Sequence, residues 1–583
     1  MTKFISNRDI VKLFREVAAA YEAKGENRFK IIAYDNAATS IEHATSELKD
    51  LWEDQKLDTI PGLGKSIREH LDELFRTGKV KHFDQIKKDL PPGMFSLLEI
   101  GGLGPKSAYK LAKALNIKNR EDLEKAAKEG KISNLPGFGE KSEEEILIAI
   151  SEFKARGSTT RYLLTDVFPV AERVLEHLKS HKDCERAEPL GSLRRMVATV
   201  GDIDIAVQSK NPKGIIGHFT KFREIKRILD AGPRKSSVIL ASGMQVDLIV
   251  QSTKAFGALL QHFTGSKNHN IHLRELALTK GMSVSDYGIK AQGKLHEFKT
   301  EEEFYRFLDL DYIEPELRED TGEIEAAVLR KLPNLVKLED IKGDIHLHSS
   351  YPIQPSHDLG ENSFEEIITK AKSLGYDYIG LSDHSPGHST HTKKQMIDLI
   401  KARTQKIEQL KSSHKDIRIL NLLEIDILAS GELSVPEEGL KLLEGSIAGI
   451  HSRHRQDKKS ITKRLMTAIN SPYVNVISHP TGRLLNQRES YEADWPRVFE
   501  ACVKTNTILE INAHPNRLDL PDTLVREAIK VGVKLIINTD AHQLTGMDNM
   551  RFGVAVARRG WCEKKDIVNT LPWVEFKKLF RYY

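Results

Sequence analysis

The segment from residue 340 to residue 583 repeats one pattern: an apolar run ends in a histidine, aspartate or glutamate, and a stretch with helical periodicity follows. Phe364–Leu374 and Thr523–Val531 are two of the helical stretches. Strands that alternate with helices and carry polar groups at their C-terminal ends are typical of a β/α barrel. Because the spacing is uneven, we predict a distorted β/α barrel. The polar strand ends lie in Gly343–Ser349, Ser382–His384, Leu423–Asp426, Gly449–Ser452, Ile477–Pro480 and Asn538–His542.

These strand ends predict a metal site. His346 and His348 are two residues apart, so both imidazoles point to one face of the expected strand. Imidazole is a frequent ligand of transition metals. One such histidine is usually a hydrogen-bonded core residue, but six polar strand ends are difficult to explain in that way. Imidazoles together with bridging carboxylates suit Mn²⁺ or Zn²⁺.

A second candidate metal site lies in the middle of the chain. Asp202 and Asp204 alternate on an expected strand and therefore project to one face, and Asp247 follows in a second strand-like run. Three clustered carboxylates repel one another unless cations bind between them. Two Mg²⁺ or Mn²⁺ ions about 3.5–4 Å apart suit in-line phosphoryl transfer. A Gly-Ser turn with two arginines, Gly191–Arg195, lies just upstream and can hold a triphosphate there.

The N-terminal third contains three glycine hairpins that each join helical sequence to helical sequence: Ile60–Ser66, Ile100–Ser107 and Leu135–Ser142. Glycines permit a tight hairpin and expose backbone N–H groups at the start of the next helix. Such groups bind phosphate without reading the bases. The first two hairpins place a lysine just past their second glycine, whereas the third has Glu140 there. We therefore predict that the first two bind DNA and that the third serves in packing.

Composition sets few further limits. A chain of 583 residues is expected to form three to five domains. The net charge of +5 does not by itself imply a nucleic-acid partner. The N-terminus lacks the apolar core of a signal peptide, and the chain lacks an apolar run long enough to span a membrane. Cys184, Cys502 and Cys562 are too far apart in sequence to form a disulfide framework or a zinc motif, so we expect a cytoplasmic protein.

Over most of residues 1–330, the Gly-Ser turn, the three aspartates and the hairpins resemble the family X DNA polymerases of the nucleotidyltransferase superfamily. The histidine-rich remainder resembles the PHP (polymerase and histidinol phosphatase) domain, which is fused to these polymerases in bacteria and archaea. The implied fold is multidomain, α+β and α/β. The expected parts are a helical DNA-end-binding domain (1–90), a helix-hairpin-helix subdomain (91–155), a nucleotidyltransferase palm (156–250), a thumb (251–320), a linker (321–339) and a PHP barrel (340–583).

The resemblance also implies site residues in the polymerase part. Asp202 and Asp204 would bind both ions, and Asp247 would bind the catalytic ion near the primer 3′-OH. Ser192, Arg195 and Gly201 would contact the triphosphate. Phe263, Gly265 and Asn270 would line the sugar and base, with Arg274 on the template strand. The DNA-binding set would be Lys30, Tyr34, Gly62, Gly64, Lys65, Gly102, Gly104 and Lys106.

Two positions depart from the family pattern. Many relatives have tyrosine where this chain has His262. How strongly this protein discriminates against ribonucleotides is therefore left open. His70 occupies the position at which some members carry a Schiff-base lysine, and imidazole cannot form that adduct. We therefore predict weak or absent deoxyribose-phosphate lyase activity.

In the PHP domain, the resemblance implies up to three ions and hydrolysis of phosphoesters. One ligand is ambiguous because the usual Ser-Asp-Gly turn is interrupted; we choose Asp358, with His357 as the rival. Arg517 and His514 are candidates for holding a phosphate, and a structural role is equally open for either. The implied ligands are His346, His348, Asp358, His384, Glu424, His451, His479, Asp540 and His542.

The expected function is a monomeric DNA-directed DNA polymerase that adds dNTPs to primed or gapped DNA in base excision repair and carries a 3′–5′ exonuclease. The alternative is a polymerase whose PHP domain is structural or acts as a separate phosphoesterase. The three aspartates argue against a DNA-binding scaffold without catalysis. The glycine hairpins argue against a small-molecule phosphatase.

Overall fold

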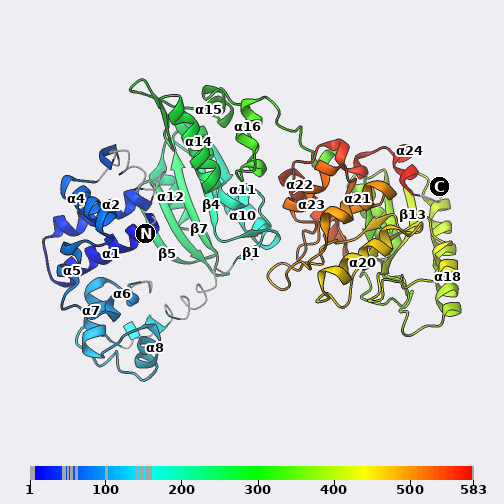
Figure 1. Cartoon of the computed structure of the whole chain (residues 1–583), viewed down its shortest axis with the longest axis horizontal. Coiled ribbons are helices and arrows are strands. Elements are labelled where there is room, and N and C mark those ends of the chain that lie inside the picture. Colours follow the sequence, from blue (N-terminus) through cyan, green and yellow to red (C-terminus); the bar gives the residue numbers. More distant parts are fainter. Residues whose placement is uncertain are drawn as a thin grey trace. The chain divides into compact units, whose positions relative to one another are not determined.

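The computed structural model describes residues 7–42, 57–59, 63–98, 103–139 and 161–580, with a few isolated positions between these ranges. The chain divides into two compact units, residues 1–160 and residues 161–583, which are described separately below. Figure 1 gives the order of the elements along the chain.

The first unit is helical and contains two hydrophobic cores. One core surrounds Phe14 and Leu71, and the other surrounds Met94 and Leu111. Helices α4 and α7 begin immediately after Gly64 and Gly104, at the ends of the first two glycine hairpins. The helices are α1 Asn7–Ala23, α2 Arg28–Glu42, α4 Lys65–Thr77, α5 Lys81–Lys87, α6 Gly93–Leu97, α7 Pro105–Ala114 and α8 Arg120–Lys128, with the 3-10 turn η1 Leu57–Thr59.

The second unit opens with a five-stranded sheet in the order β2-β4-β7-β6-β5. Strands β4 and β7 are parallel neighbours in the middle of the sheet, and the other pairs are antiparallel. The elements are β1 Tyr162–Leu163, α10 Leu164–Lys179, β2 Arg186–Pro189, α11 Gly191–Arg194, β3 Thr199–Val200, β4 Ile203–Gln208, α12 Pro212–Phe219, β5 Ile225–Ala231, β6 Lys235–Leu240 and β7 Gln245–Gln251.

A smaller helical part follows this sheet and has its own core around Leu273, Phe304 and Leu317. Residues 321–339, which we expected to be a linker, include helix α16 and bury Ile324, Leu335 and Val336. The elements are α13 Phe256–Thr264, α14 Lys267–Thr279, β8 Met282–Ser285, β9 Gly288–Ala291, β10 Lys294–His296, α15 Glu301–Phe307, η3 Pro315–Leu317 and α16 Glu323–Val328.

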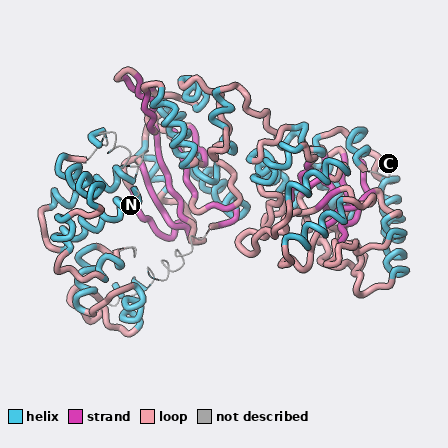
Figure 2. Tube along the Cα trace, in the orientation of Figure 1, coloured by secondary structure: helices cyan, strands magenta, loops and turns pink. Residues whose placement is uncertain are grey.

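The C-terminal part contains seven parallel strands in chain order, β11 to β17. The backbone N–H of His348 donates to the carbonyl of Ala541 at 3.0 Å, so the segments that follow β11 and β17 also meet and the sheet nearly closes. Figure 2 shows these strands inside a layer of helices. The strands are β11 Gly343–Leu347, β12 Tyr378–Leu381, β13 Arg418–Asp426, β14 Gly445–Gly449, β15 Val476–Ile477, β16 Ile508–Asn512 and β17 Leu535–Asn538.

Helices cover the outside of this barrel, and residues 571–580 fill one end. Phe576 and Phe580 pack there against Ile345 and Tyr378, which closes the end opposite the polar strand termini. The predicted distorted β/α barrel is therefore confirmed, together with the helical N-terminal part and the palm with its thumb. The main helices are α17 Phe364–Ser373, α18 Lys393–Ser413, α19 Glu437–Leu440, α20 Lys458–Ile469, α21 Trp495–Thr505, α22 Asp522–Val531, α23 Met550–Arg559 and α24 Trp573–Phe576.

Within the described part of the chain, no helix combines the length and apolarity that a membrane crossing requires. Cys184, Cys502 and Cys562 are all free thiols.

Candidate active sites

The palm sheet brings the three predicted aspartates together. Strands β4 and β7 are in register such that Asp204 lies directly beside Asp247. Asp202 immediately precedes β4, and one carboxylate oxygen from each of the three residues lies within 4.8 Å of the others. Most other positions of the two central strands are apolar. Ile203, Ile205, Val246 and Leu248 are among them, and they are buried in the core. The sheet therefore presents a compact acidic cluster near the N-terminal ends of its two apolar central strands.

The electrostatics of this cluster favour bound cations. Burial, with the neighbouring carboxylates of Asp202 and Asp247, raises the pKa of Asp204 to about 7. Burial also raises the pKa of Asp247 to about 6, against the effect of a hydrogen bond from Gln245. Three such groups resist ionisation together unless positive charge lies between them. Their oxygen-only donor set fits a hard divalent cation.

The Gly-Ser turn reaches this cluster through a close backbone approach. Gly191 has φ +57°, and a Cβ there would lie 2.6 Å from Asp204 Oδ2. The backbone N–H of Leu190 donates to the Asp204 carbonyl at 2.8 Å. Only glycine fits this position, because a side chain would meet the carboxylate. The turn thus places Ser192 and the residues after it beside the aspartates.

The two arginines of this segment lie in different environments. Arg194 is nearly buried and donates to Thr264 Oγ1 at 2.6 Å and to Glu301 Oε1 at 3.0 Å. Arg195 donates through Nε to Glu319 Oε1 at 2.9 Å, and its charge lowers the pKa of Asp204 against the effect of burial. Arg194 therefore ties the palm to the following helices, whereas Arg195 faces the acidic cluster.

The predicted sugar and base residues lie around the junction of α13 and α14. A Cβ on Gly265 would lie 3.1 Å from Arg195 Nη1, so this glycine adjoins the same site. Asn270 Nδ2 donates to the His262 carbonyl at 2.7 Å, and Arg274 Nη2 lies 3.2 Å from His262 Nδ1. These three residues are therefore neighbours, joined through the backbone carbonyl and the imidazole of His262. Phe263 and Gly201, the latter a predicted triphosphate contact, have other neighbours: the Phe263 ring centroid is 5.4 Å from Lys235 Nζ, and a Cβ on Gly201 would lie 3.8 Å from Arg161 Nη1.

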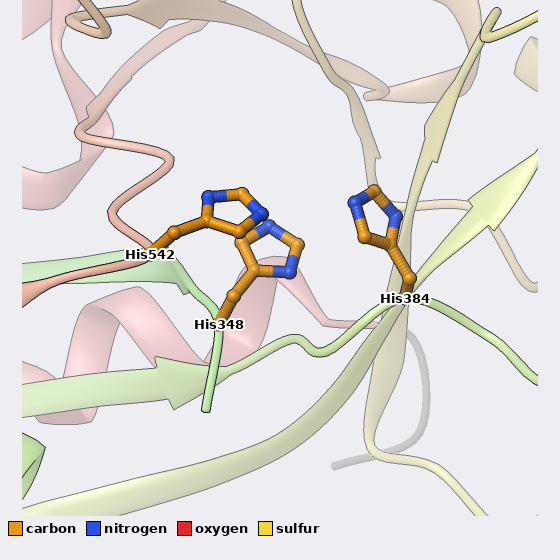
Figure 3. Close-up of side chains that lie close together, drawn as sticks. All are labelled: His348, His384 and His542. Atoms are coloured by element: carbon orange, nitrogen blue, oxygen red, sulfur yellow. The ribbon is translucent and has the colours of Figure 1, made fainter. Parts of the chain in front are cut away.

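In the barrel, the polar strand ends converge on Glu424. His346 lies within β11 and His348 directly follows that strand, and their Nε2 atoms lie 3.2 Å and 3.6 Å from Glu424 Oε2. His384 Nδ1 lies 3.1 Å from the same oxygen, and Asp540 Oδ1 lies 3.2 Å from His348 Nε2. Figure 3 shows the imidazoles of His348, His384 and His542 pointing into one space from three separate segments. His451 and His479 reach the other oxygen, Glu424 Oε1, at 3.1 Å and 2.9 Å.

This cluster has the donor atoms that a metal needs. Among the residues that the structure describes, twelve buried side-chain nitrogen or oxygen atoms lack a hydrogen-bond partner, and seven of them lie here. Buried polar atoms without a partner are costly, so a ligand is the physical explanation. The donors are imidazole nitrogens and carboxylate oxygens, which fit borderline divalent metals. The seven atoms belong to His346, His348, His384, Glu424, His479 and His542.

Two carboxylates that the sequence prediction left out support these imidazoles. Glu510 Oε1 lies 2.7 Å from His346 Nδ1, and Glu510 Oε2 accepts from the His479 backbone N–H at 2.8 Å. Asp426 Oδ1 lies 2.6 Å from His451 Nδ1, and although burial alone would lower the pKa of His451, Glu424 and Asp426 raise it to about 9. The sequence did contain a signal for Glu510, namely a carboxylate inside an apolar strand. The strand Ile508–Asn512 has this pattern, and so does the strand that carries Glu424.

The rival residues His357 and Asp358 both reach the site. His357 Nε2 lies 3.0 Å from Asp426 Oδ1, and these two residues form a candidate metal group with His451. Asp358 lies 3.9 Å from His384 Nε2 but is 78% exposed. The choice between them therefore stays open. They line a cavity of about 380 Å³, which is also lined by Arg488, His514 and Arg517.

The predicted DNA-binding residues of the first unit differ in exposure. Lys30, Lys65 and Lys106 are exposed, whereas Tyr34 is buried and its hydroxyl lies 2.7 Å from His70 Nδ1. His70 also stacks on His82 with ring centroids 5.0 Å apart. Gly64 and Gly104 directly precede their helices, whereas Gly62 and Gly102 lie outside the described residues.

Comparison with known proteins matches three segments of the chain to family models. Residues 5–80 match a helix-hairpin-helix domain, and residues 95–152 match a SAM-like helix-hairpin-helix tandem. Residues 259–319 match the DNA polymerase beta thumb.

Three relatives cover different shares of the chain. The DNA polymerase/3′-5′ exonuclease PolX of Bacillus subtilis is 35% identical over 570 residues, which is 96% of this chain and 97% of that protein. DNA polymerase lambda of Arabidopsis thaliana is 26% identical over 54% of this chain and 62% of its own length. A protein of Caldanaerobacter subterraneus named as a probable phosphatase is 27% identical over 34% of this chain and 75% of its own length.

The similarity to PolX extends through the palm, the thumb and the barrel, and the fold of each agrees with it. The chain therefore belongs to the family X DNA polymerases that carry a C-terminal PHP domain.

Proposed function

We propose that this protein is a gap-filling DNA polymerase of base excision repair that also shortens DNA 3′ ends through its barrel. The observation that carries the proposal is the aspartate cluster, in which Asp204 and Asp247 lie side by side on parallel strands with Asp202 within reach. A DNA-binding scaffold has no need for three converging carboxylates.

In the proposed palm site, Asp202, Asp204 and Asp247 would hold two Mg²⁺ or Mn²⁺ ions. Such ions activate the attacking oxygen and neutralise charge on the transferred phosphate. We assign Asp247 as the group that takes the proton of the primer 3′-OH, because it lies directly beside Asp204 in the proposed ion site. Arg195 would neutralise charge on the triphosphate, with Ser192 and Gly201 beside it.

We assign the remaining polymerase residues to positioning of the substrates. Phe263, Gly265 and Asn270 would line the incoming sugar and base, and Arg274 would contact the template strand. The cluster around His262 makes this residue the candidate determinant of sugar selection. In the first unit, the backbone at Gly62, Gly64, Gly102 and Gly104, with Lys30, Lys65 and Lys106, would bind DNA phosphates. Tyr34 would shape that surface from within the core.

In the barrel, nine residues would hold up to three Mn²⁺ or Zn²⁺ ions, which supply a nucleophile for phosphodiester hydrolysis. Glu510 and Asp426 would orient the imidazoles. Arg517, whose Nε lies 3.6 Å from Asp540 Oδ2, would hold the phosphate of the terminal nucleotide. The proposed ligands are His346, His348, His384, Glu424, His451, His479, Asp540, His542 and Asp358 or His357.

The decisive experiment measures primer extension and primer shortening on one gapped DNA, with Mg²⁺ and Mn²⁺ compared. Asp204→Asn should abolish extension and leave shortening intact. The paired change His346→Ala with His348→Ala should do the reverse. Loss of both activities in either variant, with its unfolding temperature unchanged, would contradict two independent sites.

The same experiment tests the alternative function of the barrel. If the wild-type protein extends primers but never shortens them, the barrel is structural or acts on another phosphoester. This alternative is supported by the similarity of about a third of the chain to a protein named as a probable phosphatase. Release of phosphate from 3′-phosphorylated DNA or from small phosphomonoesters would then identify the substrate.

Further proposals follow from the sequence. We propose that the protein is a cytoplasmic monomer, and that its domains are bounded near residues 90, 155, 250, 320 and 340. We also propose that His70 leaves lyase activity weak or absent, since imidazole forms no Schiff base.

A further inference from the structure

Arg559, the last residue of α23 in the barrel domain, contacts the turn that carries Arg195 in the palm. Its Nη1 donates to the backbone carbonyl of Arg195 and to Glu319 Oε1, each at 2.9 Å. Its Nε donates to Asp522 Oδ2 at 2.7 Å. The side chain is only 9% exposed. A buried guanidinium with acceptors on three residues is held in one orientation by its fork of donors.

Glu319 links the two arginines directly. Arg195 Nε donates to Glu319 Oε1 at 2.9 Å, which is the oxygen that also accepts from Arg559. The positive charge of Arg559 therefore offsets part of the attraction between Glu319 and Arg195. Without Arg559, Glu319 would pair with Arg195 alone and would compete with a triphosphate for it. The Arg195 carbonyl would also lose its donor, which loosens the end of the turn Gly191–Arg194.

We propose that Arg559 is a positioning residue for nucleotide binding, through which the barrel domain completes the polymerase site. Arg559 acts through Glu319 and the backbone of Arg195 and does not touch the reacting atoms. This inference rests on the proposed function of the palm. It implies that the barrel contributes to DNA synthesis independently of its own metal site.

The test is steady-state kinetics of single-nucleotide insertion on gapped DNA with Mg²⁺. Arg559→Gln should raise the KM for the dNTP on the order of fivefold, within the usual range for coupling between separate sites, and should change kcat much less. Arg559→Lys should restore part of the affinity, because one ammonium can reach Glu319 or Asp522 but cannot reproduce the fork. An unchanged KM in Arg559→Gln would overturn the inference.

Arg551→Gln is the matched control. Arg551 lies on the same helix and faces the same palm, where it is 3.4 Å from Glu172 and packs over Phe168 with 4.6 Å to the ring centroid. It has no contact with the turn. The KM of Arg551→Gln for the dNTP should equal that of the wild-type protein. An equal rise in both variants would mean that a loosened interface is the cause, and would contradict a specific action on Arg195.

A double variant separates action through Arg195 from a parallel effect. If Arg559 acts through Arg195, adding Arg559→Gln to Arg195→Ala should raise KM no further. Additive increases would overturn the inference. Should Arg559→Gln fail to fold, Arg559→Lys carries the test, and a wild-type KM there is the contradicting result. Absence of any extension by the wild-type protein would instead refute the proposed function.

Discussion

At the scale of single residues, Asp204 predicts an unusual dependence of stability on pH. Its pKa in the folded protein is raised to about 7, well above that of an exposed aspartate, mainly by burial. The folded state therefore favours the protonated form, and this stabilisation, complete at low pH, is lost as pH rises through 7. Asparagine cannot ionise, so Asp204→Asn should be more stable than the wild-type protein at pH 8 without metal, by about 2 kcal/mol after allowance for partial exposure.

Thermal unfolding in the presence of a chelator at pH 8 and pH 5 measures this difference. The gain of Asp204→Asn should be largest at pH 8 and should shrink at pH 5, and added Mg²⁺ should stabilise the wild-type protein more than the variant. A wild-type protein that is more stable than the variant at pH 8 without metal would show that the three carboxylates do not strain the fold.

Glu510 gives a second prediction, for the barrel. Glu510→Gln keeps the shape of the side chain but removes the charge that faces His346 Nδ1. Because carboxylates behind metal-bound histidines raise affinity, the variant should bind metal about 10–100-fold more weakly. Metal content after dialysis and the Mn²⁺ concentration for half-maximal primer shortening measure the effect. Primer extension serves as the internal control and should not change; wild-type metal content would contradict the prediction.

The sequence predicted single residues well where the pattern was local. Asp202, Asp204 and the His346–His348 pair could be recognised because strand periodicity alone places each pair on one face. Glu510 and Asp426 could not be recognised in this way, because their role depends on contacts with imidazoles from other parts of the barrel. The difference between Arg194 and Arg195 was equally hidden, since it depends on Glu301 and Glu319, more than a hundred residues away.

At the scale of elements, the two hairpin helices α4 and α7 predict non-specific binding to DNA. Lys65 and Lys106 are exposed in the first turns of these helices. Each lysine that contacts a phosphate contributes roughly one unit to the slope of log affinity against log salt. Lys65→Ala and Lys106→Ala should each weaken binding to gapped DNA equally for all sequences and lower that slope by about one. Fluorescence anisotropy across a salt series measures both quantities.

Lys128→Ala is the control for these variants. Lys128 lies in the last turn of α8 in the same unit and pairs with Glu124 at 2.9 Å. Its removal should leave the salt slope unchanged. If Lys128→Ala lowers the slope as much as Lys65→Ala does, the binding depends on overall charge and the hairpins have no special part in it.

Elements were predictable to the extent that their periodicity is regular. The barrel strands followed from apolar runs, and the observed order β11 to β17 matches their order in the chain. The region 321–339 was different: we assigned it as a linker because it lies between the expected thumb and the expected PHP barrel, yet it forms α16 and contributes Ile324 and Leu335 to the core that contains Trp561. A six-residue helix has too little periodicity to be recognised, and tertiary contacts stabilise it.

At the scale of the whole molecule, the separation of hydrophobic cores predicts how the chain unfolds. The cores of the first unit contain only residues before 151, and the remaining cores contain only residues after 160. Within the second unit, palm and barrel share contacts: Phe168 packs on Phe552 with ring centroids 5.6 Å apart, and Trp561 joins the thumb core. These contacts join segments far apart in sequence, so no sequence pattern indicated them. We expect two unfolding transitions, with palm, thumb and barrel unfolding together.

Calorimetry with and without Mn²⁺ tests this expectation. Metal that binds only the folded barrel should stabilise the second unit by about 2.7 kcal/mol at a hundredfold excess over Kd. Trp52 is the only tryptophan before residue 161, so Trp52→Phe restricts the fluorescence signal to the second unit. In that variant, tryptophan fluorescence should report one transition, and Mn²⁺ should raise its midpoint. The calorimetric transition of the first unit should not move. A separate Mn²⁺-dependent transition for the barrel alone would show that palm and barrel are energetically independent, in spite of their shared contacts.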